Sequence, residues 1–194
     1  MWFFEEGVIV YSDKHKEQKK IQMLEKCFEL FVKQGLENTS MNDLAEYCGL
    51  HKATIYSYFK SKDEVVLESA KQYMETLENK LYRHATTLRP TIKEALKDGF
   101  QVFCDEKNNL RYIYQVISSP KYGEISRKSL KKIYNKYLDY SDVFADLYGL
   151  NKKEFRPYYL LLIGSLHDYC MWDNVEVVEE KLDYIFSRVE SIAN

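Results

Sequence analysis

The sequence is poor in proline and glycine, with three prolines and seven glycines among its 194 residues. Because both residues interrupt helices, their scarcity favours a protein built almost entirely of helices. Hydrophobic residues make up 45% of the chain, which is enough for a sizeable core at this length. No internal repeat or low-complexity segment is found. We therefore expect an all-α protein.

The chain also lacks a strong excess of charge, since its formal net charge is −2 at pH 7. This near balance excludes a general nucleic-acid coat protein, which would be strongly basic. The charges are unevenly placed, however, because residues 14–62 hold nine lysines and six acidic residues. A net charge of +3 therefore lies near the amino terminus. The segment "KHKEQKK", residues 14–20, is either a solvated arm or a stretch that follows a nucleic-acid backbone.

A long hydrophobic run is missing as well. The opening stretch "MWFFEEGVIVY" is apolar, but Glu5 and Glu6 interrupt it, it has no basic segment, and it is too short to span a bilayer. Neither a signal peptide nor a membrane-spanning helix is predicted. We interpret this stretch as an extension that packs on the body of a cytoplasmic protein without membrane contact.

Cysteine and histidine are too few and too scattered to suggest a metal or catalytic centre. The four cysteines are widely separated, and most fall on apolar helical faces, so we expect reduced core thiols. His167 and Cys170 stand one helical turn apart and could share a metal, but a third ligand is missing. No nucleophile, base and orienting group stand in a recognisable pattern. The sequence predicts no cofactor, no metal and no enzyme.

A short helix followed by a tight turn is indicated from Ser40 onward. Ser40 is a good amino-terminal cap, and Gly49 can adopt the left-handed conformation that ends a helix. Between them, apolar or small residues recur at helical spacing: Met41, Leu44, Ala45 and Cys48. We therefore predict a helix that ends at Cys48.

The next helix, predicted over Lys52–Lys60, has an unusual outer face. Ile55 and Phe59 share one face and form its buried stripe. Ala53 and Ser57 lie on the opposite face, where an ordinary surface helix would carry long charged residues. Small residues at these positions indicate that another molecule approaches closely.

The combination of Ala45, Gly49 and Ile55 is typical of a helix-turn-helix, whose second helix enters the major groove of DNA. Ala45 leaves room for the crossing helix, Gly49 makes the turn, and Ile55 anchors the second helix. Upstream, Ile21, Leu24, Phe28 and Phe31 form an apolar stripe that stops at Gly35. A first helix of about four turns should complete a three-helix core.

Three segments carry a family resemblance: "FVKQG", "TSMNDLAEYCGL" and "KATIYSYFKSKDEV". In order, spacing and aromatic pattern, this first third of the chain closely resembles the DNA-binding domain of tetracycline-repressor (TetR) family regulators. His51 departs from the pattern, since the family often has a serine that caps the recognition helix. The imidazole could cap this helix less well or contact DNA.

The resemblance implies DNA contacts at matching positions. Lys52, Ala53 and Ser57 are expected at base edges, while hydroxyl-bearing flanks hold the sugar-phosphate backbone. The flanking residues are Thr54, Tyr56 and Tyr58, joined by Lys62 at the start of the fourth helix. Asn42 could reach a phosphate or a base edge near the start of its helix. The alternative is that Tyr56 and Tyr58 are aromatics at the edge of the core.

Beyond Lys62 the pattern is helical throughout, so about nine helices are expected in all. We assign residues 14–62 to the helix-turn-helix DNA-binding domain and residues 63–194 to a helical ligand-binding and dimerisation domain. Its helices are predicted over residues 63–85, 91–106, 110–117, 124–148, 153–172 and 175–192. Pro157 either kinks the fifth of these or lies in its true first turn.

The helix over Tyr158–Trp172 is apolar nearly all round, so it needs two partners. The resemblance implies that the last two helices pair with those of a second subunit in a homodimer. The expected interface residues are Leu161, Gly164, Ser165, Tyr169 and Tyr184. The alternative is that this helix is the buried centre of a monomer.

Many aromatic residues lie between the expected interface and the DNA-binding domain. In the family this region encloses a ligand cavity, and rings with a few hydroxyls would suit a lipophilic or aromatic molecule. The candidate ligand-binding residues are Phe100, Phe103, Tyr112, Tyr137, Tyr140 and Phe144. Each of them could equally be ordinary core.

Together these features and the resemblance predict a ligand-responsive transcriptional regulator that binds a palindromic operator as a homodimer. The sequence itself does not give the sign of regulation, and the resemblance implies repression, the usual mode of the family. Binding of an effector would move the continuous fourth helix and lower the affinity for the operator. The alternative is a DNA-binding regulator without small-molecule input, whose second domain serves dimerisation or protein contacts.

Overall fold

The computed structural model describes the backbone of residues 5–193 and the side chains of residues 14–193. Over this range the chain forms nine helices and no strand, which confirms the all-α prediction. None of the described helices is long and apolar enough to cross a lipid bilayer. The helices are α1 (Glu5–Gln34), α2 (Met41–Cys48), α3 (Lys52–Tyr58), α4 (Lys62–Ala85), α5 (Ile92–Asp105), α6 (Lys107–Ser118), α7 (Gly123–Leu147), α8 (Lys152–Trp172) and α9 (Val175–Ala193).

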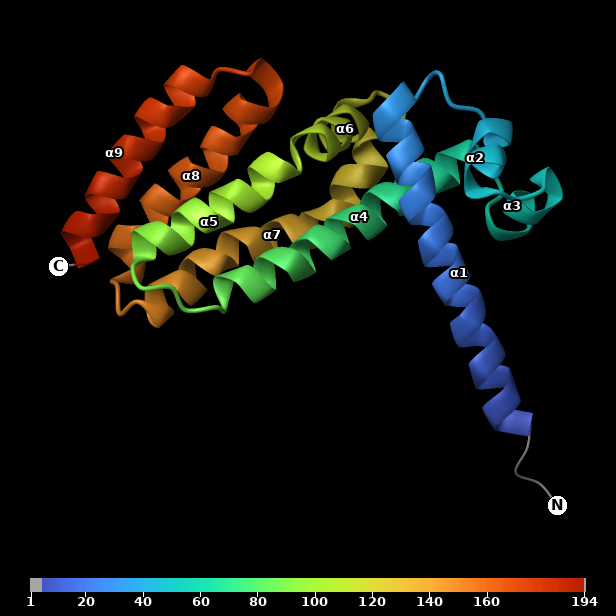
Figure 1. The fold of residues 1–194 in the computed structure, drawn as a ribbon, viewed down its shortest axis with the longest axis horizontal. Coiled ribbons are helices and arrows are strands. Elements are labelled where there is room, and N and C mark those ends of the chain that lie inside the picture. The colour runs from blue at the N-terminus through green and yellow to red at the C-terminus, as the bar shows by residue number, and fades with distance from the viewer. Residues whose placement is uncertain (1–4, 194) are drawn as a thin grey trace.

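Helices α1, α2 and α3 pack around one small core at one end of the molecule (Figure 1). Phe31, Leu44, Ile55 and Phe59 are buried almost completely within it. Helix α3 ends at Tyr58, two residues before the predicted end. Phe59 instead takes an extended backbone conformation and turns its ring into the core, so it is buried outside the helix that was expected to carry it.

Helix α1 is longer than predicted. It ends before Gly35, as expected, but it begins at Glu5 and spans 30 residues. No proline interrupts this segment, and the good helix formers of residues 14–20 extend the helix beyond the core. Its first half projects away from the other helices (Figure 1), so the expectation that the opening stretch packs on the body is wrong from Glu5 onward. Residues 1–4 lie outside the described residues.

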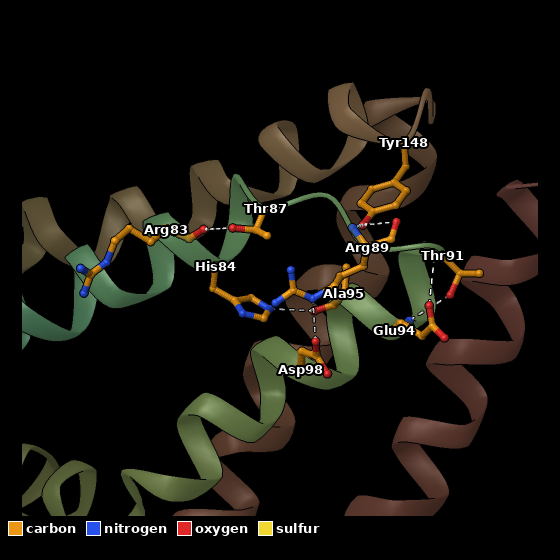
Figure 2. A network of polar contacts seen from close by, with 9 residues as sticks. All are labelled: Arg83, His84, Thr87, Arg89, Thr91, Glu94, Ala95, Asp98 and Tyr148. Carbon is orange, nitrogen blue, oxygen red and sulfur yellow. Dashed lines mark hydrogen bonds and ion pairs between the residues drawn. The ribbon is translucent and has the colours of Figure 1, made fainter.

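Helix α4 runs without a break from the three-helix unit along α7 to the opposite end of the molecule (Figure 1). A polar corner holds that far end (Figure 2). His84 Nε2 lies 3.1 Å from the carbonyl oxygen of Ala95, and Arg89 Nε donates to Asp98 at 2.8 Å. The backbone N–H of Arg89 donates to the Tyr148 hydroxyl at 2.9 Å. The His84 contact ties the end of α4 to α5, and the Arg89 bonds tie the connection after α4 to α5 and to the end of α7, so the far end of α4 is anchored.

Helices α8 and α9 form a hairpin at the end remote from α3 (Figure 1). Helix α8 begins at Lys152 because the Asn151 side chain caps it, accepting from the backbone N–H of Lys153 at 2.9 Å. Pro157 therefore lies inside the helix and not in its first turn.

Candidate DNA interface and effector cavity

The start of α2 is fixed by a reciprocal cap. The backbone N–H of Ser40 donates to Asp43 Oδ2 at 2.7 Å, and the backbone N–H of Asp43 donates to Ser40 Oγ at 3.2 Å. The hydrogen bond from the Ser40 N–H lowers the pKa of the Asp43 carboxyl group. The carboxylate stays ionised beside the positive end of the helix.

The end of α2 forms the turn that the sequence predicts. Gly49 has φ 70° and ψ 34°, a left-handed conformation that suits glycine. The Leu50 N–H donates to the Ala45 carbonyl oxygen at 2.8 Å, and the Gly49 N–H donates to that of Glu46 at 2.9 Å. This pair of bonds is a Schellman motif. It leaves only three residues, 49–51, between α2 and α3.

Helix α3 presents the polar face that the pattern predicts. Ile55 is fully buried, so the opposite face points to solvent. Lys52, Ala53, Tyr56 and Ser57 are exposed on this face. The flanking residues Thr54 and Tyr58 are half-buried.

Two contacts within α3 order its exposed side chains. The Ser57 hydroxyl donates to the Thr54 carbonyl oxygen at 2.6 Å, which leaves the Ser57 oxygen able to accept a hydrogen bond. The Lys52 ammonium lies 5.9 Å from the centre of the Tyr56 ring. His51 is exposed and precedes the helix without making a side-chain cap.

A shallow hollow of about 450 Å³ joins α3 to its neighbours. It brings together four of the predicted DNA contacts, Asn42 from α2, Lys52 and Tyr56 from α3, and Lys62 from α4. Ala53, Thr54, Ser57 and Tyr58 are the predicted contacts that do not line it. These four residues supply two cations, an amide and a phenol, which suit phosphate oxygens. The carboxylate of Glu37 also lines the hollow, so the positive charge there is partly balanced.

A second and chemically different space lies inside the carboxy-terminal part. It is a cavity of about 370 Å³ between α4, α5, α6, α7 and α8. Its lining is largely aliphatic and aromatic. The lining residues are Met74, Phe103, Leu110, Ile113, Tyr114, Ile117, Arg127, Leu130, Lys131, Tyr134, Tyr137, Ile163 and Leu166.

Of the six residues expected to bind a ligand, Phe103 and Tyr137 line this cavity. The other four have different surroundings. Phe100 packs against the Tyr169 ring, and Phe144 against that of Tyr159. Tyr140 donates to the Glu78 carboxylate at 2.6 Å. Tyr112 packs on α1. Most of the lining is aliphatic, and in a sequence such residues cannot be told from ordinary core.

The rim of the cavity carries positive charge that the sequence reasoning missed. Arg127 and Lys131 lie one turn apart on α7 and both are exposed. An Arg127 nitrogen donates to the Ile117 carbonyl oxygen at 2.6 Å, which holds the guanidinium beside the opening. Arg127 and Lys131 are four residues apart in the sequence, on the same helical face as Leu130 and Tyr134. This spacing could have indicated from the sequence a pair of cations beside an apolar surface.

Tyr112 joins the cavity wall to the unit formed by α1, α2 and α3, which carries most of the predicted DNA contacts and is called the DNA-binding unit below. It lies on α6, between the cavity residues Leu110 and Ile113. Its ring makes an edge contact with Phe28 and stacks on Phe31, with centroid distances of 5.1 and 5.8 Å. Its hydroxyl is buried and makes no hydrogen bond within 3.5 Å among the residues that the structure describes. Burial raises the pKa of this hydroxyl, and the neighbouring Ser69 side chain partly opposes the rise. The wall of the cavity thus touches α1 directly.

The Tyr112 contact is one junction between the cavity helices and the DNA-binding unit. A second junction holds the start of α4. Lys121 Nζ lies 2.6 Å from Asp63 Oδ1, and the Tyr122 hydroxyl donates to the same oxygen at 2.8 Å. These hydrogen bonds, with that from Lys121 the stronger cause, lower the pKa of the Asp63 carboxyl group. Lys121 and Tyr122 connect α6 to α7, and Asp63 follows Lys62 of the DNA face. Both junctions therefore link helices of the cavity to the DNA-binding unit.

The predicted dimer face is open on α8 and α9. A groove between these helices is lined by Leu161, Gly164, Ser165 and Tyr184, among others. Leu161 and Tyr184 are about half exposed, and a Cβ built on Gly164 would meet no atom within 4 Å. Ser165 is buried and donates to the Leu161 carbonyl oxygen at 3.0 Å. Tyr169 is the exception, because its ring packs inward on Phe100.

His167, which was considered with Cys170 as a metal ligand, contacts an aromatic ring instead. The His167 ring packs edge-on against Tyr114, at a centroid distance of 5.2 Å. Within the part of the chain that the structure describes, no three histidine, cysteine or acidic side chains gather as metal ligands would.

Comparison with known proteins agrees with this geometry. Residues 24–69, which include α2 and α3, match the model of "Bacterial regulatory proteins, tetR family". The chain is 24% identical over 185 residues to the biofilm operon icaADBC HTH-type negative transcriptional regulator IcaR of Staphylococcus aureus, covering 90% of this chain and 97% of IcaR. It is 27% identical over 96 residues to the uncharacterized HTH-type transcriptional regulator YerO of Bacillus subtilis, covering 47% of this chain and 33% of YerO.

Solved structures share the fold well beyond the matched segment. The transcriptional regulator FadR of Bacillus subtilis, in complex with stearoyl-CoA, superposes with a TM-score of 0.61 at 19% identity, covering 87% of this chain and 98% of FadR. A TetR/AcrR-family regulator of Thermobifida fusca gives 0.59 at 19%, covering 87% and 97%. Members of the tetR family are DNA-binding transcription factors and not enzymes. The helix-turn-helix, the nine described helices and these relatives together support a TetR-family transcriptional regulator.

Proposed function

We propose that this regulator is a homodimeric repressor that binds a palindromic operator and releases it when a small lipophilic molecule enters the cavity. The observation that carries the ligand response is the apolar cavity of about 370 Å³, whose helices α6 and α7 adjoin both junctions with the DNA-binding unit. The relative IcaR is named a negative transcriptional regulator, which supports repression.

At the DNA face, α3 enters the major groove. Lys52, Ala53 and Ser57 face the base edges, where the small Ala53 admits a thymine methyl group. The remaining predicted contacts hold phosphates and fix the register of the helix. These contacts are Asn42, Thr54, Tyr56, Tyr58 and Lys62.

The homodimer forms through the groove between α8 and α9. Exposed apolar side chains surround it, including Leu160, Leu161 and Tyr184, and Trp172 at the end of α8 is 72% exposed. Apolar surface of this extent favours a protein partner. Because the two-fold axis of a dimer relates two α3 helices, the operator should be palindromic, with half-sites about one DNA turn apart.

The effector is an amphipathic anion in this proposal. The apolar lining suits an acyl or aromatic body, and the rim cations Arg127 and Lys131 suit a carboxylate or phosphate at one end. The similar fold of FadR, a regulator solved with stearoyl-CoA, is consistent with this class.

Release follows from the two junctions. A ligand that separates α6 from α7 moves the Tyr112 ring against Phe28 and Phe31, and moves the residues that hold Asp63. The polar corner fixes the far end of α4, so the displacement appears at the DNA-binding end. The spacing of the two recognition helices changes, and the affinity for the operator falls.

The ligand class is tested by thermal unfolding of the full chain with laurate and with dodecanol, which has the same chain length but no charge. We expect laurate to raise the unfolding temperature more than dodecanol. The difference should disappear in the Lys131→Gln variant. A matched control is Lys128→Gln, because Lys128 lies on the same helix but does not line the cavity. If neither compound stabilises the protein, the acyl-anion class is wrong.

A further inference from the structure

Two cysteines from different helices meet in the core of the DNA-binding unit. Cys27 of α1 is fully buried, and Cys48, the last residue of α2, is 9% exposed. Their sulfur atoms lie 3.9 Å apart. A disulfide has an S–S distance of about 2.0 Å, so the two sulfur atoms must move about 2 Å closer to form a covalent bond.

The two thiols differ in their readiness to ionise. The hydrogen bond from the Cys27 thiol lowers the pKa of Cys48, burial opposes this, and the nearby Lys26 ammonium also lowers it. The pKa of Cys27 is raised, by its hydrogen bond to Cys48 and by burial. Cys48, which is also the more accessible of the two, therefore ionises more readily than Cys27, which is the thiol that keeps its proton longer.

We propose that Cys27 and Cys48 are an oxidative modification site, a dithiol that hydrogen peroxide converts to a disulfide within the DNA-binding unit. The Cys48 thiolate attacks one peroxide oxygen, the O–O bond breaks, and the hydroxide that leaves takes a proton to become water. Cys48 is then a sulfenic acid. The Cys27 sulfur attacks the Cys48 sulfur, the S–O bond breaks, and the Cys27 proton leaves with the hydroxyl group as a second water. Two thiols lose two electrons, and one peroxide is reduced.

The position of Cys48 makes this modification relevant to DNA binding. It directly precedes Gly49, whose turn sets α3 against α2. A disulfide draws the end of α2 toward α1, while Ile55 and Phe59 remain fixed in the core. The recognition helix must then tilt, and its phosphate contacts lose their register. We expect the affinity for DNA to fall at least tenfold, and to recover when a dithiol reductant opens the bond.

The experiment treats the full chain with hydrogen peroxide, maps its peptides by mass spectrometry, and measures binding to a duplex selected from a random DNA pool. We expect a Cys27–Cys48 cross-link with the loss of two hydrogens, and a tenfold weaker affinity that dithiothreitol restores. The double variant Cys104→Ser, Cys170→Ser is the matched control, because it removes the two thiols outside the DNA-binding unit. It should keep the full response.

Cys48→Ser and, separately, Cys48→Ala should bind the duplex without any response to peroxide. Two replacements are used so that a folding defect in one does not decide the result. Absence of the cross-link after peroxide treatment would overturn the proposal, because the mapping does not depend on DNA binding. A cross-link that leaves the affinity within twofold of the reduced protein would overturn its regulatory role.

Discussion

The DNA face and the effector cavity differ in how the chain builds them. The DNA face comes from one continuous segment, residues 40–62, whose outward side chains are polar and exposed. The cavity takes its lining from five helices between α4 and α8, and its side chains are mainly apolar. Residues of the DNA face therefore carry little of the folding free energy, whereas residues of the cavity pack the fold and, in our proposal, also bind the effector. Substitutions can separate these two kinds of residue.

The largest expected effect lies under the DNA face. Ile55→Ala removes a fully buried side chain from the three-helix core, so we expect the free energy of unfolding to fall by about 2–5 kcal/mol. Ile113→Ala, at the cavity wall, should cost less, because Ile113 already borders empty space. Urea denaturation of both variants measures the difference. Equal losses would show that the cavity is packed as tightly as the core.

The next effect concerns binding alone. Tyr56→Phe removes a hydroxyl that we assign to a phosphate, a bond to a charged group worth about 1.5–3 kcal/mol, so affinity should fall at least tenfold on every DNA sequence. The unfolding temperature should not change. Tyr82→Phe is the control, since Tyr82 is similarly exposed on α4 outside the DNA face.

Ser57→Ala provides the contrast with Tyr56→Phe, because Ser57 is assigned to the base edges. It should change which operator sequence is preferred, as binding to a panel of variant duplexes would reveal. A uniform loss across the panel for both variants would contradict the assigned roles.

A smaller effect is expected from the cations of the hollow. Lys52→Gln and Lys62→Gln should each reduce the slope of log affinity against log salt concentration by about one, because each removes one neutralised phosphate. Lys128→Gln serves again as the control, since Lys128 pairs with Glu124 on α7. If the slope does not change for Lys62→Gln, Lys62 does not contact a phosphate.

The smallest effect lies at the junction between the two regions. Tyr112→Phe removes a buried hydroxyl that is unpaired within the described structure. We expect the free energy of unfolding to rise by about 1 kcal/mol, because an unpaired buried polar group is costly. Thermal denaturation tests this, and a loss of stability would show that the hydroxyl bonds to a group such as the Ser69 side chain or water.

The helix-turn-helix could be predicted from the sequence because its signals are local. Ser40, Gly49 and the Ile55 stripe act within a few residues of one another, and the structure has the cap, the turn and the buried face at these positions. The end of α3 was missed because Phe59 is buried by tertiary contacts, which helical periodicity does not report.

The cavity could not be predicted in the same way. Its lining joins residues as distant as Met74 and Leu166, and most are aliphatic side chains that look like core. Aromatic content therefore pointed to Tyr140 and Phe144, which pack elsewhere. Tyr169 was assigned to the dimer face from its helix alone, but its ring packs inward on Phe100. Which side chains line the cavity and which lie on the dimer face depends on which helices become neighbours in the fold.

The most direct test of the account is the operator affinity of the full chain with and without laurate at a concentration that saturates the cavity. We predict at least tenfold weaker binding with laurate, and no change in Ile113→Trp, whose larger side chain fills the cavity. A ligand that occupies the cavity in the original chain but leaves operator affinity unchanged would contradict the coupling between the two regions.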